Sequence, residues 1–265
     1  MRICSIASGS SGNCIYIGDD KNHILIDAGI SRKRIVDGLQ SIGVAPEQLD
    51  AIFVTHEHSD HISGINMMSK MFGTSVFATG GSLDAICMKD KKGMVKRENL
   101  YQLYADEAVH IGKLKVVPFH MSHDAADPVC YTVESDGKKV GMATDLGVYD
   151  EYIIDHLAGS DVLLLEANHD ISMLEAGKYP YSLKCRILSE LGHLSNEAAG
   201  KLLCRLVHKK LKYAFLAHLS KENNYPELAY ETVRLEVELG DNPYKGDDFP
   251  MFVAKRDEVS QKIVF

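Results

Sequence analysis

Short apolar runs separated by polar turns make up most of this 265-residue chain. Runs rich in Ile, Val, Leu and Phe that are bounded by Gly, Asn, Asp or Ser predict buried β-strands. The Asp136-Gly137 pair between two such runs predicts a hairpin with a tight turn. The predicted strands lie at residues 2–7, 14–17, 23–26, 49–55, 75–79, 114–119, 130–134, 139–143, 161–165, 213–217 and 251–254.

Helical spacing of apolar residues appears between the strands. Ser31 is a good N-cap, Ile35 and Leu39 recur four residues apart, and Gly43 ends the pattern. A Met-rich buried helix is predicted over residues 62–72, ending at Gly73. Two more helices are expected, one opened by Ser195 with Leu202, Leu203, Leu206 and Val207 inside, and one from Pro226 to about Leu239.

Strands that alternate with helices place the chain in the α/β (α+β) class. No internal repeat, low-complexity tract or linker is visible in the sequence. A length of 265 residues suits a sandwich or α/β fold that folds as one unit, so we predict a single domain over residues 1–265. Apolar residues at 45% and charged residues at 25% are ordinary for a globular protein with a sizeable core.

Many predicted strands end in a residue that can bind a metal or move a proton. Taken alone, each would more often be structural. When many strands deliver such side chains to one edge of a sheet, that edge is the expected site. These residues are Asp27, His56, His123, Asp145, Glu166 and His218.

The most informative of these strand ends reads His56-Glu-His-Ser-Asp-His61 and follows the apolar run Ile52–Val54. Neutral imidazole and carboxylate are ligands that borderline divalent metals prefer. His56 and His58 are two residues apart, so an extended backbone points both to the same side. Asp60 and His61 follow once the chain turns and can face a second position. The spacing favours two neighbouring metals over a His-rich surface loop.

Net charge and cysteine content limit the binding partners and the cellular location that we expect. The net charge of −8 argues against loose, nonspecific nucleic-acid binding but leaves room for a nuclease with a local basic patch. The six cysteines are scattered without a CxxC pair, so we expect reduced thiols. No secretory leader or membrane-length apolar run is visible. A cytoplasmic location is predicted, and nothing in the sequence indicates a stable protein partner.

Each of two further segments can have a binding function or be only a structural part of the surface. The loop Ser8–Asn13 consists of small residues with exposed amides, which can bind an anion or form a plain hairpin loop. Residues 82–98 form the most basic stretch, which is either a solvated helix or loop or a patch that steers phosphates. Its cations are Lys89, Lys91, Lys92, Lys96 and Arg97.

The ordered motif residues resemble those of the metallo-β-lactamase-fold hydrolases. The resemblance covers essentially the whole chain and implies a four-layer αββα sandwich with a dinuclear metal site at one sheet edge. It implies that His56, His58 and His123 hold one metal and that Asp60, His61 and His218 hold the other. Asp145 would bridge the two metals, and Asp27 would orient the histidine loop by hydrogen bonds.

A closer resemblance is to the YycJ/WalJ (VicX) group, which is regarded as acting on DNA from 5′ to 3′. It rests on the stretches Ser8–Asn13, Asn168–Asp170, Gly192–Asn196 and His218–Asn224. Glu166 and His193 are also similar to the Glu and His of two motifs of the tRNA 3′-processing nucleases. The 72 residues between Asp145 and His218 leave no room for a β-CASP domain. A compact nuclease with an open groove is implied.

The implied chemistry is hydrolysis of phosphodiester bonds by a metal-bridging hydroxide. His193 is the candidate proton donor, Glu166 would hold its imidazole, and Asp60 would also orient the hydroxide. The metals can be zinc, manganese or iron, because His and Asp ligands suit all three. DNA is the expected substrate, and candidate phosphate or sugar contacts are Ser10, Ser11, Asn13, Asn196 and Asn223.

Some assignments stay open at this point. Alignment with the motif favours His123 over His120 as a metal ligand, but the spacing of the two histidines does not decide between them. A role for His169, which is close to the motif residues in sequence, is also open. A thioester, ester or lactone hydrolase of the glyoxalase II type shares the HxHxDH motif and is the alternative function. A di-iron redox protein of the same fold is weakened, because that branch usually has a carboxylate where His58 stands.

Overall fold

The computed structural model describes residues 1–90 and 93–265, and the chain packs into two compact units. The first unit comprises Met1–His120, Ala125–Gly137 and Lys255–Phe265, and the second comprises Met121–Asp124 and Lys138–Ala254. Lys91 and Lys92 of the basic stretch lie outside the described residues. That residues 1–265 form a single domain without an insertion stays a prediction.

The first unit contains a seven-stranded sheet in the order β14-β1-β2-β3-β4-β5-β6. Strands β14 to β3 pair antiparallel, and β3 to β6 pair parallel. Ile26 lies opposite Phe53, so the carboxyl ends of β3 and β4 reach the same edge. The strands are β1 (Arg2–Ala7), β2 (Cys14–Gly18), β3 (His23–Ile26), β4 (Ala51–Phe53), β5 (Ser75–Ala78), β6 (Leu100–Gln102) and β14 (Ile263–Val264).

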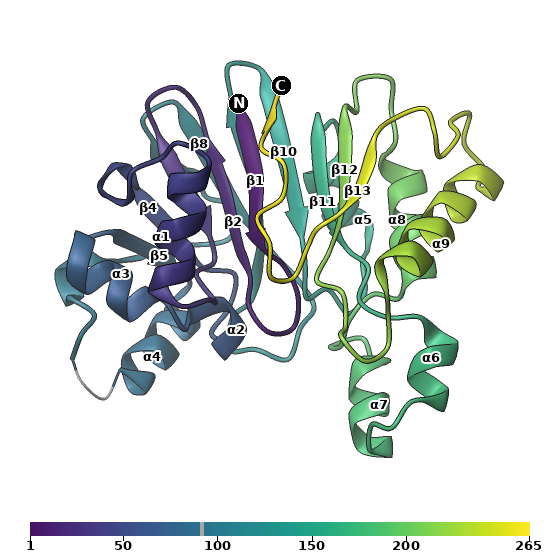
Figure 1. The fold of residues 1–265 in the computed structure, drawn as a ribbon, viewed down its shortest axis with the longest axis horizontal. Helices are drawn as coiled ribbons and strands as arrows, with labels where there is room; N and C mark the ends of the chain where they lie inside the picture. The colour runs from purple at the N-terminus through teal and green to yellow at the C-terminus, as the bar shows by residue number, and fades with distance from the viewer. Residues whose placement is uncertain (91–92) are drawn as a thin grey trace. The chain divides into compact units, whose positions relative to one another are not determined.

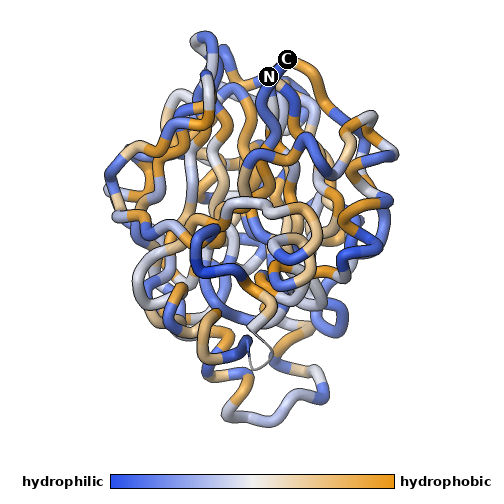
Figure 2. Tube along the Cα trace, turned by 90° about the vertical axis from the view of Figure 1, so that its left-hand side faces the viewer, coloured by the Kyte–Doolittle hydropathy of each residue, from blue (hydrophilic) through white to orange (hydrophobic). Residues whose placement is uncertain are grey.

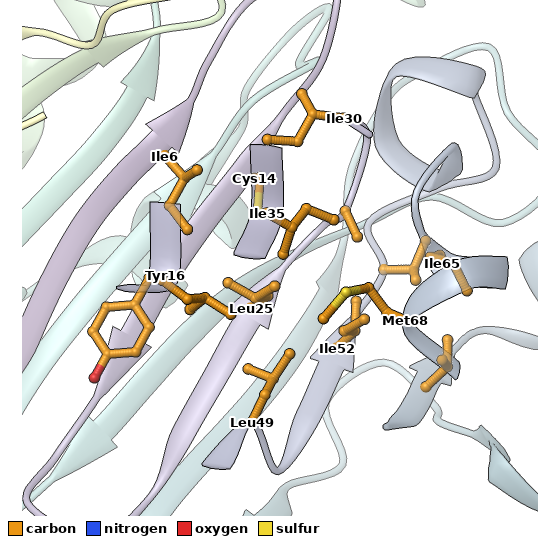
Figure 3. Close-up of a cluster of buried hydrophobic side chains, with 14 of the residues drawn as sticks. Ile6, Cys14, Tyr16, Leu25, Ile30, Ile35, Leu49, Ile52, Ile65 and Met68 are labelled. Atoms are coloured by element: carbon orange, nitrogen blue, oxygen red, sulfur yellow. The ribbon is translucent and has the colours of Figure 1, made fainter. Parts of the chain in front are cut away.

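Helices α1 (Arg32–Ser41), α3 (Ile65–Phe72) and α4 (Gly80–Lys89) lie along this sheet (Figure 1). The predicted N-cap is confirmed, because the Ser31 side chain accepts a hydrogen bond from the backbone N–H of Arg34. Figure 3 shows the core between helices and strands, where Ile35 of α1 and Met68 of α3 approach Leu25 and Ile52 of the sheet. Burial of these apolar side chains fixes the helices on the sheet.

The single helix predicted over residues 62–72 is wrong in detail. The segment forms two helices, α2 (Ser59–Ile62) and α3, separated at Gly64. The N–H of Gly64 donates to the carbonyl of Ala28 at 2.7 Å, and a Cβ at Gly64 would lie 2.4 Å from the carbonyl oxygen of Ile30. Close approach of the preceding loop therefore requires glycine and interrupts the helix. Gly73 ends α3 with a φ of 67°, as predicted.

Three antiparallel strands complete the first unit: β7 (Val109–Ile111), β8 (Leu114–His120) and β9 (Val129–Ser135). After β9, Asp136 and Gly137 both have positive φ, which matches the tight turn predicted from the Asp-Gly pair. The short strands β6, β7 and β14 were not predicted, since they are too brief to show a period. Two 3₁₀ helices cover Pro46–Gln48 and Arg97–Asn99.

The second unit contains four parallel strands, β10 (Lys138–Ala143), β11 (Val162–Glu166), β12 (Tyr213–Ala217) and β13 (Met251–Val253). Helices α5 (Glu151–Leu157), α8 (Asn196–Leu206) and α9 (Pro226–Leu239) lie beside them, and α6 (Ile171–Ala176) and α7 (Tyr181–Ile187) lie together farther away (Figure 1). The predicted α8 and α9 are confirmed. Helices α5, α6 and α7 have at most seven residues and give no clear helical pattern in the sequence.

Hydrophobic stretches of the chain are short and alternate with hydrophilic ones (Figure 2). Among the helices of the described residues, none combines the length and the apolar character that crossing a bilayer requires. The six cysteines are free thiols, as predicted.

Candidate metal centre

In the first unit the HxHxDH motif occupies the turn from β4 into α2, as predicted. His58 is the N-cap residue of α2, with extended backbone angles, and the next turn contains Asp60 and His61. The His56 and His61 side chains are buried, whereas His58 and Asp60 are partly exposed. The motif therefore presents four metal-binding groups within six residues, two of them accessible from solvent.

Asp27 fixes the orientation of two of these histidines. Its Oδ1 accepts from the backbone N–H of Thr55 at 2.8 Å, and its Oδ2 lies 2.7 Å from Nδ1 of His61. The Thr55 hydroxyl lies 3.0 Å from Nδ1 of His56. Because Nδ1 of each ring is held in this way, Nε2 is the nitrogen presented to a metal. The sequence predicted this role for Asp27 but missed Thr55, whose only signal is its place between β4 and His56.

The loop Ser8–Asn13 is tied to the same motif. The Asn13 backbone N–H donates to the carbonyl of Asp60 at 2.8 Å, and its side-chain Nδ2 lies 3.1 Å from Nε2 of His61. The Asn13 amide also donates to the carbonyl of Gly9 at 3.2 Å, so it keeps a partner if a metal takes His61. Ser10 and Ser11 at the loop tip are exposed. The loop thus presents two hydroxyls beside a buried asparagine that contacts the motif.

Close backbone contact holds α2 against the end of β3. The N–H of Ala28 donates to the carbonyl of His61 at 2.8 Å. A Cβ at Gly29 would lie 1.6 Å from the carbonyl oxygen of Asp60, so only glycine fits. Sequence reasoning did not identify Gly29 as a site residue, and the Asp27-Ala28-Gly29 order was its only signal.

Glu57, between the first two histidines, is structural in this arrangement. Its Oε1 accepts from the N–H of Ala126, and its Oε2 lies 3.3 Å from the hydroxyl of Ser82. The Glu57 backbone carbonyl accepts a hydrogen bond from Nζ of Lys89 at 2.7 Å, so one cation of the basic stretch stabilises the histidine loop. Lys96 and Arg97 of the same stretch are exposed.

In the second unit, Asp145 and His218 follow the ends of β10 and β12, with φ values of 60° and 56°. Asp27 of the first unit has the same left-handed backbone, with a φ of 61°. Residues other than glycine rarely adopt this region, and such strain concentrates at functional sites. The distance from Nε2 of His218 to Oδ1 of Asp145 is 3.5 Å, and the corresponding distance from Nε2 of His123 is 3.9 Å.

Glu166 organises the second unit's histidines. Its fully buried Oε1 lies 2.8 Å from Nδ1 of His193 and 2.9 Å from Nδ1 of His218, and its Oε2 accepts from the N–H groups of Leu146 and Leu194. Burial by itself raises the pKa of Glu166, but the charges and hydrogen bonds of His193 and His218 outweigh it and lower that pKa to about 2. Glu166 is therefore an ionised partner of two imidazoles.

His193 lies beside this carboxylate with 15% of its side chain exposed. Burial lowers the pKa of His193, but the charge and hydrogen bond of Glu166, together with Asp145, raise it above its ordinary value. An imidazole with a raised pKa, its Nδ1 held and an exposed edge is suited to proton transfer. The ligand atoms of Asp145, Glu166, His193 and His218 all lie within 4.8 Å of one another.

The structure distinguishes His123 from His120. His123 is 5% exposed, and its Nδ1 lies 3.2 Å from the carbonyl oxygen of Gly192, which leaves Nε2 on the side of Asp145. Burial, opposed by Asp145, lowers the pKa of His123 and favours the neutral form that binds metals. The His120 side chain, at the end of β8, is 62% exposed and lies 3.8 Å from Asp127. That His123 and not His120 is the ligand stays a prediction, which the burial of His123 favours.

Three polar residues near Glu166 are buried. Asn196 is fully buried and hydrogen-bonds Asn224, and Asn223 is 1% exposed. The burial of Asn196 and Asn223 does not support direct contact between these residues and a substrate.

His169 is 1% exposed, and neither of its ring nitrogens has a hydrogen-bond partner among the described residues. Burial lowers the pKa of His169 to about 4. Asn168 was missed as a site residue, and its Nδ2 donates to the carbonyl of His218 at 2.9 Å.

With both sets of side chains described, comparison with known proteins gives the family. A family model described as "Beta-lactamase superfamily domain" matches residues 22–218. The chain belongs to the metallo-β-lactamase superfamily. The predicted fold is thereby confirmed. The metallo-β-lactamase fold protein YhfI from Bacillus subtilis is 16% identical and has a TM-score of 0.71, with 99% of both chains covered.

Two relatives narrow the family further. Exodeoxyribonuclease WalJ of Streptococcus pneumoniae is 38% identical over 95% of this chain and 93% of its own length. Exodeoxyribonuclease YycJ of Bacillus anthracis is 34% identical over 90% of this chain and 89% of its own length. The resemblance to the WalJ/YycJ group that the sequence motifs indicated is confirmed over nearly the full chain.

Proposed function

We propose that this protein is a metal-dependent exodeoxyribonuclease. The observation that carries the proposal is the 38% identity to WalJ over 95% of the chain. The ligand chemistry supports it independently, because Nδ1 of His56, His61, His123 and His218 is held by a second partner, which makes Nε2 of each ring the nitrogen that would bind a metal. Digestion from 5′ to 3′ and a cytoplasmic setting are part of the proposal.

The donor set fits divalent metals. In the proposal, His56, His58 and His123 would hold one ion, Asp60, His61 and His218 would hold the second, and Asp145 would be a ligand to both. Imidazole and carboxylate suit zinc, manganese and iron alike, so cellular supply would decide which ion is bound. The contacts made by Asp27, Thr55 and Glu166 orient these ligands and raise their basicity.

Bound metals would activate water at neutral pH and stabilise charge on the phosphate. His193 donates a proton to the oxygen of the leaving nucleotide, and Glu166 favours the charged form of this imidazole and holds its Nδ1. Asp60 also accepts a hydrogen bond from the attacking water. Ser10 and Ser11, at the exposed loop tip, contact the phosphate or sugar, while Asn13 holds that loop in place.

A time course on DNA and RNA labelled at either end tests the proposal. Single- and double-stranded substrates are incubated with chelated protein to which zinc, manganese or iron is returned separately. Shortening from the 5′ end of DNA, dependent on the added metal, is the expected result. Thioester or lactone turnover without any DNA shortening would instead establish the small-molecule hydrolase alternative.

A further inference from the structure

Helix α7 has an apolar stripe on its exposed side. Lys184, Cys185 and Leu188 lie three, four and seven residues after Tyr181, which places the four residues on one helix face. Tyr181 is 82% exposed and Leu188 is 46% exposed, whereas Ile187 on the other side is buried. Leu191, in the loop after the helix, is 51% exposed. An apolar face of this kind on a surface helix indicates a binding surface.

The stripe leads directly to the proposed catalytic residues of the same unit. The N–H of His193 donates to the carbonyl of Ile187 at 3.0 Å, so the end of α7 fixes the backbone of His193. Arg186 forms an ion pair with Asp124, next to His123, in which Nη2 lies 2.9 Å from Oδ1. The seven residues of α7, Tyr181 to Ile187, make six steps that span about 9 Å along the helix axis. Tyr181 is therefore about three nucleotides away from the end of α7 that holds His193, at about 3.4 Å per nucleotide of a DNA strand.

Charge and side-chain type favour a nucleic-acid strand as the occupant. Between residues 171 and 191 there are three cations and two carboxylates, and Arg186 among the cations is paired with Asp124, so this segment is close to neutral in a chain whose net charge is −8. Lys178 is exposed, and Nζ of Lys184 donates to a backbone carbonyl, that of Glu175, at 2.6 Å. An exposed aromatic ring with flanking lysines is the combination that binds single-stranded DNA without sequence preference.

We propose that the stripe on α7, with Tyr181 as a base-stacking residue, binds the single-stranded end of the DNA substrate beside His193. This inference rests on the proposed exodeoxyribonuclease activity and identifies the part of the protein that grips the strand. Tyr181 is a positioning residue, since it touches the substrate away from the reacting phosphate. It should act on the Michaelis constant for DNA more than on the turnover number.

The test compares the metal-loaded wild-type protein with Tyr181→Ala, Tyr181→Phe and, as a matched control, Tyr104→Ala. Tyr104 is an exposed tyrosine of the first unit. KM and kcat are measured on a single-stranded oligodeoxynucleotide and on bis(p-nitrophenyl) phosphate, a small diester that does not reach α7. We expect Tyr181→Ala to raise KM for DNA about tenfold with little change in kcat, because one stacked base is lost. Tyr181→Phe and Tyr104→Ala should behave like the wild type, and the small diester should be hydrolysed equally by all four.

An unchanged KM for DNA in Tyr181→Ala would overturn the inference. Equal loss of activity on the small diester would also overturn it, because the substitution would then have disturbed the site itself. If Tyr181→Ala changes only self-association in sedimentation, the stripe is a protein interface instead. A wild-type protein that cleaves no DNA refutes the proposed function separately. Fluorescence anisotropy with the same oligonucleotide then decides about α7: binding weakened in Tyr181→Ala supports it, and equal binding overturns it.

Discussion

Replacement of Glu166 by glutamine is the sharpest perturbation of the candidate metal centre. The change keeps the size of the side chain and removes its charge. In the wild type, one carboxylate oxygen faces two imidazole Nδ1 atoms and the other accepts two backbone N–H groups. A glutamine must direct its NH₂ group at one of these donor pairs, so at least one buried donor loses its acceptor.

The expected size of the effect follows from the pKa of Glu166. A fall from its ordinary value of 4.5 to about 2 corresponds to on the order of 3 kcal/mol of stabilisation of the ionised carboxylate in the folded protein. Loss of that amount in a chain of this size should lower Tm by about 5–10 °C. Metal affinity and activity should fall about 10- to 100-fold, because the glutamine no longer orients His218 and His193 as the carboxylate does.

The pH dependence gives a second measurement on metal-free protein. The raised pKa of His193 means that its stabilising contribution is fully present below its unfolded pKa and is lost as pH rises through the folded value. The difference in Tm between wild type and Glu166→Gln should therefore be larger at about pH 6 than at about pH 9. Glu190→Gln, an exposed glutamate in the loop before His193, is the control. Wild-type metal content and Tm in Glu166→Gln would refute the reasoning.

Three further substitutions test other parts of the proposed site. His58→Ala should abolish metal-dependent hydrolysis while circular dichroism stays native, and full activity with confirmed metal content would contradict the ligand assignment. His193→Ala should slow catalysis by about 10²-fold while metal stays bound, since it removes a general acid; loss of metal, measured by mass spectrometry, would make it a ligand instead. Gly29→Ala places a Cβ 1.6 Å from the Asp60 carbonyl oxygen, so it should destabilise the protein by several kcal/mol, measured by urea unfolding, and release the metal. An unfolding curve like that of the wild type would contradict the close packing of α2 on this loop.

Period and composition in the sequence predicted most of the long elements. The runs that became β1, β2, β11 and β12 are short and almost fully buried, so their apolar residues stand out between turn residues. The caps at Ser31 and Ser195 are local interactions within four residues, and both are present as predicted. The exceptions, such as α5 and α7, are too short for a pattern to accumulate.

The chemistry of the site was visible because its ligands follow strand ends. Residue type alone predicts a metal-binding edge of the sheet, from His56–His61 together with Asp145 and His218. No local pattern indicates that Asp27, Asp145 and His218 adopt a left-handed backbone, since that conformation depends on what packs around each strand end.

The sequence by itself determined the family, the metal-binding residue types and the order of the main strands and helices, because these depend on side-chain chemistry and short periods. Only the tertiary structure decided which nitrogen of each imidazole is hydrogen-bonded and which residue is its partner. Thr55 contacts His56, Gly192 contacts His123, and Glu166 contacts both His193 and His218, the latter across 52 residues of sequence. Only the tertiary structure, too, buried Asn196 and exposed Tyr181, because exposure depends on the neighbours that folding brings to a residue and not on the residue type.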